Sequence, residues 1–130
     1  MKTLFILTLL ILNSNANIKV IATNSCNFKS LNSHQIKHLF LLNIKEVNTQ
    51  KIVVFNRKST QLIDSFSLDL LDKKPRQLKT YWTRMIFTGV KQAPANISNL
   101  NLKNRTMCYV SYEYTKRAIP KTWKRIVIND

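Results

Sequence analysis

The segment Arg57-Lys58-Ser59-Thr60 carries the residue types best suited to bind an oxyanion. It follows an apolar run that predicts a buried strand, 51–55, and it opens a predicted helix. The first N–H groups of a helix are unpaired and lie at the positive end of its dipole, so they attract anions. Arg57 can bind an oxyanion through two parallel hydrogen bonds, and Lys58 adds charge. The alternative interpretation is an ordinary N-cap at Ser59 or Thr60 beside two solvated cations.

Other kinds of chemistry find little support in the sequence. His34 and His38 are four residues apart on a predicted helix, but the HExxH zinc motif is absent, since no glutamate follows His34 and Lys37 precedes His38. The one glycine, Gly89, excludes glycine-rich nucleotide loops, and six acidic residues leave few candidates for a paired-carboxylate site. No GxSxG motif is present. We therefore expect no enzymatic activity, no metal and no cofactor.

The N-terminal residues have the layout of a secretory signal peptide. A positive start is followed by an apolar run, 4–12, and by small residues at Ser14 and Ala16. The run is shorter than the roughly 20 residues that a membrane-spanning helix needs. We expect residues 1–16 to be a signal peptide and residues 17–130 to be one periplasmic or secreted domain without a transmembrane segment.

Cys26 and Cys108 are the two cysteines of the chain. In an exported protein they would enter an oxidising compartment, where disulfides persist. They either form one disulfide, which would close a long loop, or remain two separate buried thiols.

Strand and helix patterns alternate along residues 17–130. Strands are expected at 18–22, 51–55, 107–111 and 125–128. One helix is expected after an N-cap at Ser33, a second after an N-cap at Ser59 or Thr60, and a third from Pro75. One or two helical turns are expected within 97–103. The alternation favours an α/β fold with a mostly parallel sheet flanked by helices. Ligands of such sheets bind outside the carboxyl ends of the strands, here residues 23–27, 56–60 and 111–114.

The helix expected from Pro75 has the clearest periodicity. Its apolar residues recur at i, i+3, i+4, i+7 and i+8, and Gly89 suits a left-handed C-terminal cap. The members of this apolar face are Leu78, Tyr81, Trp82, Met85 and Ile86.

The chain is strongly basic, with 21 Lys or Arg against 6 Asp or Glu and a formal net charge of +15. Basic residues surround Trp123 in the segment 116–125, a combination that can bind nucleic acid or an anionic membrane. Because an exported protein rarely meets nucleic acid and the charge is spread along the chain, we expect a solvated basic surface and no nucleic-acid partner. Association with anionic lipid is a weaker alternative.

Several segments resemble the phosphate-binding proteins of bacterial ABC transporters, and especially a short single-domain group related to them. The run KTYWTRMIFTG at 79–89 is similar to the YWSRLIFTG signature of that group. The segment 52–55 is similar to an IVPV strand, and 107–114 to an AIGYVEYAY strand.

This resemblance implies a single lobe of a type-II periplasmic-binding-protein-like fold. In the family, an RxxGSGT segment supplies Arg, Ser and Thr to phosphate at a helix N-terminus, and its counterpart here is the segment 57–60. Both glycines of that motif are missing here. The resemblance implies a non-catalytic, exported protein that binds phosphate or a similar oxyanion through Arg57, Lys58, Ser59 and Thr60, beside a transporter or another periplasmic protein. The alternative is a periplasmic protein-interaction module that kept the fold and lost the ligand.

Overall fold

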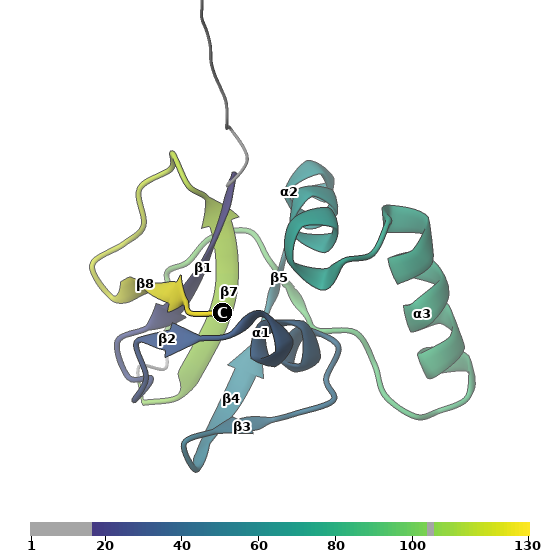
Figure 1. Ribbon diagram of the computed structural model, residues 1–130, viewed down its shortest axis with the longest axis horizontal. Helices are drawn as coiled ribbons and strands as arrows, with labels where there is room; N and C mark the ends of the chain where they lie inside the picture. The colour runs from purple at the N-terminus through teal and green to yellow at the C-terminus, as the bar shows by residue number, and fades with distance from the viewer. Residues whose placement is uncertain (1–16, 104–105) are drawn as a thin grey trace, which may run out of the picture.

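The computed structural model describes residues 17–103 and 106–130, so the predicted signal peptide at 1–16 lies outside the described residues. The chain forms a curled six-stranded sheet on one side and three helices on the other (Figure 1). Within the described residues, no helix combines the length and apolar character that a bilayer crossing requires.

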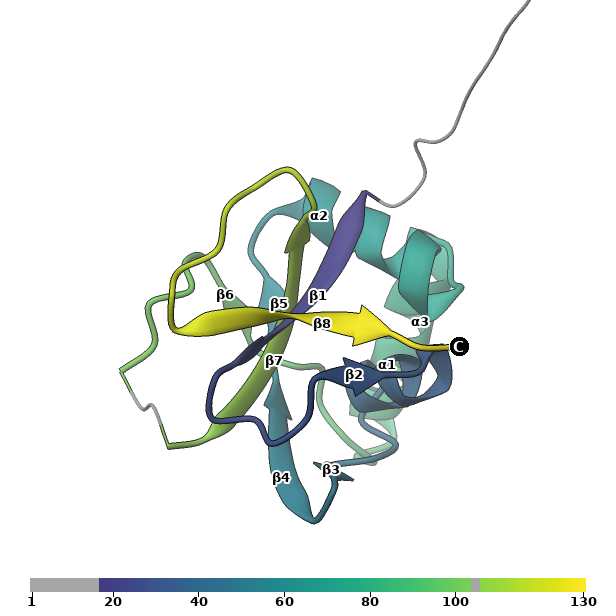
Figure 2. The same cartoon turned by 60° about the vertical axis from the view of Figure 1, so that its left-hand side comes forward.

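The sheet has the strand order β2-β8-β1-β7-β4-β3. Its strands are β1 (Ile18–Thr23), β2 (Ser30–Leu31), β3 (Glu46–Val47), β4 (Gln50–Val54), β7 (Cys108–Tyr114) and β8 (Trp123–Ile128). Two further short strands, β5 (Asn56–Arg57) and β6 (Asn96–Ile97), pair with each other in parallel. Figure 2 shows β8 running across the direction of β1, its neighbour, so the sheet is strongly twisted.

The α/β class is confirmed, but the prediction of a mostly parallel sheet is wrong. β1 pairs antiparallel with both of its neighbours, β7 and β8, whereas β4 with β7 and β2 with β8 are parallel. Alternating strands and helices predict parallel pairing only where a helical crossover joins adjacent strands. The connection from β4 to β7 is such a crossover. β1 instead lies between two strands from the C-terminal part of the chain.

β1 separates two apolar clusters. All six of its residues are buried, as expected of a central strand covered on both faces. Val20 and Ala22 belong to the main core, which the helices cover, whereas Ile21 packs with Leu100 and Trp123 in a smaller cluster. This alternation follows from the two-residue period of a strand.

Helix α1 (Ser33–Phe40) begins one residue earlier than predicted, because Asn32 and not Ser33 is its N-cap. The Asn32 side chain accepts the Gln35 N–H at 2.7 Å, and the Gln35 side chain accepts the Asn32 N–H at 3.0 Å. The two bonds form a capping box, which satisfies two N–H groups at once. Ser33 instead donates its N–H to Asp130 near the C-terminus.

Helix α2 (Thr60–Phe66) is capped by Ser59 and continues as a π-helical turn, η2 (Ser67–Leu71). After Asp72, whose φ is 56°, helix α3 (Pro75–Phe87) begins with the expected proline in its first turn. The helix expected after an N-cap at Ser59 or Thr60 and the helix expected from Pro75 are therefore both confirmed.

The predicted helical turns at 97–103 do not form. The described part of the chain has β6 there, followed by irregular backbone. The Asn101 N–H bonds to the Asn99 side chain at 3.0 Å. Asparagine side chains compete with the helical hydrogen bonds of the backbone, which explains the difference.

A disulfide joins Cys26, just after β1, to Cys108, the first residue of β7. Both residues are almost fully buried. The bond therefore fixes the carboxyl end of β1 to the start of the antiparallel strand beside it, across a sequence separation of 82 residues.

Replacing both cysteines, Cys26→Ala with Cys108→Ala, is expected to lower the free energy of unfolding by about 4 kcal/mol, because the unfolded chain regains the freedom of a long loop. Urea unfolding of the purified protein measures this difference. Reduction of the unmodified protein should destabilise it comparably, and a loss below about 1 kcal/mol in both cases would show that the sheet does not depend on the bond.

Candidate functional site

The strands bring two of the three predicted ligand segments together. Because β4 and β7 are parallel and Val54 lies opposite Val110, residues 56–60 follow β4 beside the end of β7, residues 111–114. The third segment, 23–27, lies at the other end of β7, because β1 runs antiparallel to it. The three segments therefore do not form one site, contrary to the expectation for a parallel sheet.

Arg57 points into the protein. Only 6% of its surface is exposed. Its Nη1 donates to Glu113 Oε2 at 3.0 Å and to the Tyr112 carbonyl oxygen at 2.8 Å. Its Nε is buried and has no hydrogen-bond partner among the described residues. The guanidinium thus serves chiefly as the counter-charge of a buried carboxylate.

Tyr112 completes this buried polar group. Its hydroxyl bonds to Asn56 Oδ1 at 2.9 Å and accepts the Arg57 N–H at 3.3 Å. Its ring stacks on Phe66 of α2, with the centroids 3.8 Å apart. Burial raises the pKa of Tyr112 well above its usual value, so the phenol stays neutral. The group joins β5, β7 and α2.

The rest of the predicted oxyanion segment is exposed. The Lys58 N–H donates to the Ile97 carbonyl at 3.0 Å, so it is already used in the short ribbon. Ser59 accepts the Leu62 N–H at 3.3 Å as the cap of its own helix. Thr60 faces a groove between α2 and α3. This arrangement fits the N-cap interpretation, and oxyanion binding by the four residues stays a prediction.

The groove between α2 and α3 is a second candidate surface. It is lined by Asn56, Thr60, Ile63, Asp64, Pro75, Arg76, Leu78, Lys79 and Trp82. Two cations and a hydroxyl face this groove together with one carboxylate, that of Asp64. The groove is open to solvent, where water weakens electrostatic attraction for a small anion.

The outward face of α3 carries exposed positive charge. Leu78 and Trp82 are buried against the core, which leaves Arg76, Lys79 and Arg84 exposed. From Lys73 to Lys91 the chain has no Asp or Glu. Its six cations are Lys73, Lys74, Arg76, Lys79, Arg84 and Lys91. The helical periodicity that predicts the buried face also predicts this exposed basic face, because the positions between the apolar residues must point to solvent.

Tyr81 anchors α3 to the body of the protein. Its hydroxyl donates to the Leu41 carbonyl at 3.2 Å. The ammonium groups of Lys73 and Lys91 lie 5.4 and 5.5 Å from its ring centroid. Cations at that distance are attracted to the negative face of the ring. Two of the six cations are therefore held in place by this aromatic ring.

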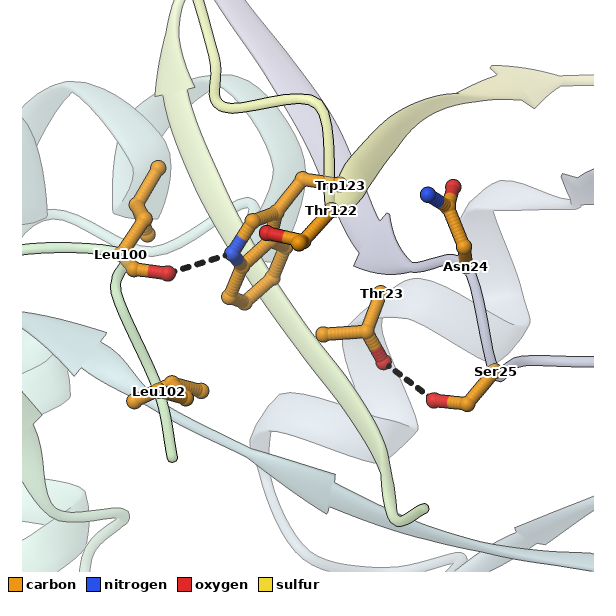
Figure 3. A pocket seen from close by; sticks show the side chains of 7 residues that line it. All are labelled: Thr23, Asn24, Ser25, Leu100, Leu102, Thr122 and Trp123. Atoms are coloured by element: carbon orange, nitrogen blue, oxygen red, sulfur yellow. Dashed lines mark hydrogen bonds between the residues drawn. The ribbon is translucent and has the colours of Figure 1, made fainter. Parts of the chain in front are cut away.

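A small pocket lies at the carboxyl end of β1 (Figure 3). Four of its side chains already form hydrogen bonds within the protein, those of Thr23, Asn24, Ser25 and Trp123. Trp123 Nε1 donates to the Leu100 carbonyl at 2.6 Å, and the hydroxyls of Thr23 and Ser25 are 2.8 Å apart. Asn24 donates to the Lys121 carbonyl at 2.7 Å. These bonds are structural and explain how the loop before Trp123 is held.

The histidines of α1 lie against each other, with ring centroids 4.2 Å apart. His38 Nδ1 shares a hydrogen bond with Asn43 at 2.8 Å. Burial, followed by the charges of His34, Lys37 and Lys91, lowers the pKa of His38. Within residues 17–103 and 106–130, no three or more His, Cys, Asp or Glu side chains group closely enough to hold a metal ion.

Glu113 is the residue that sequence reasoning missed in the predicted site. The sequence contains a signal for this residue, since Glu113 is the single acid in the otherwise uncharged strand sequence CYVSYEY. A buried carboxylate needs a cation beside it. The basic segment that follows the parallel neighbour β4 was the place to look for one.

No protein-family model matches this chain. No curated protein matches it either.

Removing the buried carboxylate, Glu113→Ala, is expected to cost about 3–5 kcal/mol of unfolding free energy, because it leaves Arg57 buried without its counter-charge. The control is Arg117→Ala. Arg117 also faces Glu113, at 3.7 Å, but its side chain is largely exposed, so its removal should cost less than about 1 kcal/mol. Denaturant unfolding of both variants measures the difference, and equal losses would contradict the assignment of Arg57 as the principal partner.

Proposed function

We propose that this chain is a non-catalytic, exported interaction module that receives a negatively charged partner on the outward face of α3. The observation that carries the proposal is the charge of the segment 73–91, with six cations and no carboxylate. Arg76, Lys79 and Arg84 are exposed there on one helix. Such a face attracts an anionic surface over a distance of about 8–10 Å at physiological salt.

Export is supported by the disulfide. Cys26 and Cys108 are paired and buried, as is common in proteins that fold in an oxidising compartment. The positive start of the chain and the apolar run at 4–12 support the same location. The proposal does not depend on a periplasmic-binding-protein lobe, whose mostly parallel sheet the chain lacks.

Phosphate or another small oxyanion is the second candidate ligand. One observation favours it, namely the buried Arg57 Nε that has no partner among the described residues. The interaction module is favoured over this alternative, because Nη1 of Arg57 already donates to Glu113 and to the Tyr112 carbonyl in the interior of the protein. Lys58 and Thr60 remain exposed, and water weakens the electrostatic attraction between exposed groups and a small anion.

The charge of α3 is tested with the double variant Lys79→Gln, Arg84→Gln, and poly-L-glutamate serves as the anionic probe. We expect its affinity to fall about 30-fold, because each of the two cations near an anionic surface contributes on the order of 1 kcal/mol. The matched control is Lys116→Gln, Lys121→Gln, which removes the same charge from the loop before β8, on the other side of the molecule (Figure 1). Equal losses in both variants would show that net charge alone drives binding and would contradict the proposal.

Free phosphate is tested separately by calorimetric titration at moderate salt. We expect no saturable heat at millimolar phosphate. Saturable binding that disappears in Lys58→Gln, Thr60→Ala would instead establish the second candidate. Both of these residues are exposed, so the variant should keep its fold.

A further inference from the structure

The last turn of α3 and the residues after it expose an apolar tip, defined here as Ile86, Phe87 and Val90. These side chains are 53%, 90% and 65% exposed. They are three of the six large hydrophobic residues that the described part of the chain exposes, and they fall within five positions. Exposed apolar residues gathered in one short segment mark an interaction site more often than singly scattered ones do.

The backbone holds this tip in place. The Gly89 N–H donates to the Ile86 carbonyl and the Val90 N–H to the Met85 carbonyl, both at 3.0 Å. Gly89 has a φ of 72°, and these features together form a Schellman motif. Val90 usually would pack back on the helix in such a motif, but here most of its surface faces solvent.

Cations lie at two levels above the tip. A shallow hollow on α3 is lined by Lys79, Thr80, Thr83, Arg84 and Phe87. At a rise of about 1.5 Å per residue, Arg84 stands about 4.5 Å and Lys79 about 12 Å before Phe87 along the helix. A lipid headgroup layer is about 5–7 Å thick. When α3 stands along the bilayer normal and Phe87 reaches the acyl chains, Arg84 is therefore at the headgroup phosphates. Lys79 then lies outside the headgroup layer, within the roughly 8–10 Å over which surface charge acts at physiological salt.

Arg84 also removes an electrostatic obstacle. The C-terminal end of a helix carries partial negative charge, which by itself repels an anionic surface. Arg84 is the basic residue in the last turn of α3. Lys91, which follows the tip, is held near Asn43 by a hydrogen bond of 2.6 Å.

We propose that the apolar tip inserts into an anionic phospholipid bilayer while Arg84 contacts its headgroups and Lys79 is attracted to their charge from just outside them. This inference rests on the proposed function and names its partner. The end of α3 that carries the tip lies at the edge of the molecule (Figure 1). The hollow that Phe87 lines there is shallow. A bilayer accepts a projecting apolar tip without a complementary shape. A second copy of the chain is disfavoured as the partner, because each copy carries a net charge of +15.

The experiment measures binding of the purified protein to phosphatidylcholine vesicles with and without phosphatidylglycerol, by co-sedimentation at low and high salt. We expect binding only to the anionic vesicles, weakened by salt. Phe87→Ser should weaken it at least about fivefold, because one large apolar side chain leaves the bilayer. The control is Val127→Ser, at an exposed hydrophobic position on β8 that is 61% exposed, and it should bind like the unmodified protein.

Insertion has its own measurement. Phe87→Trp places an indole at the tip. Lipids brominated on their acyl chains should quench the fluorescence of this variant more than that of the unmodified protein, whose two tryptophans are Trp82 and Trp123. Equal quenching in the two proteins would overturn the proposal. Because Phe87 is almost fully exposed, these substitutions should leave the thermal unfolding unchanged, which circular dichroism checks.

The two proposals fail in different ways. If Phe87→Ser binds anionic vesicles like the unmodified protein, while Lys79→Gln, Arg84→Gln binds both vesicles and poly-L-glutamate weakly, the membrane proposal is overturned and an acidic protein partner remains. If Lys79→Gln, Arg84→Gln binds both anionic vesicles and poly-L-glutamate as tightly as the unmodified protein does, both the membrane proposal and the proposed function are overturned.

Discussion

A carboxylate buried in the sheet needs a counter-charge, and much of this structure follows from how Glu113 obtains one. Only 2% of Glu113 is exposed, and Arg57 supplies its closest cation. Bringing Arg57 to that place requires the chain after β4 to turn in beside the end of β7. The short ribbon of β5 and β6 and the start of α2 are positioned by this requirement.

The same ion pair divides the basic residues of the chain into two roles. Arg57 neutralises a buried charge and so contributes to stability, whereas the cations of α3 have no carboxylate in their own segment. Replacing a buried pair by apolar residues is often harmless in other proteins. Here the pair also fixes where α2 begins, and α2 with η2 determines where α3 lies against the core.

The fold was predictable where one face of an element had to be buried. The β-branched residues of β4 indicated a strand, and the apolar periodicity of α3 with Pro75 in its first turn indicated a helix. Both elements lie where these patterns predict them. Strand order was not predictable in this way. β1 is buried on both faces in either a parallel or an antiparallel sheet, so its sequence does not state the direction of its neighbours. The N-cap was misplaced by one residue because Asn32 and Ser33 are both good caps.

The candidate site shows a similar limit. The segment 57–60 has the composition of an anion site, but composition does not state which way Arg57 faces. Its direction depends on Glu113, which is 56 residues away in the sequence. The charge of α3 was available from the sequence, since a helix that buries Leu78 and Trp82 must expose the residues between them.

A protein of this shape is better suited to a surface than to a small molecule. In the pocket beside β1, the side chains of Thr23, Asn24, Ser25 and Trp123 already bond within the protein. The groove between α2 and α3 is open and holds a carboxylate among its cations. Specific binding of a small ligand requires enclosed, unpaired polar groups, because only those gain more from the ligand than from water. An extended partner, in contrast, gains from many weak contacts at once. The exposed cations and the ordered apolar tip of α3 supply contacts of that kind.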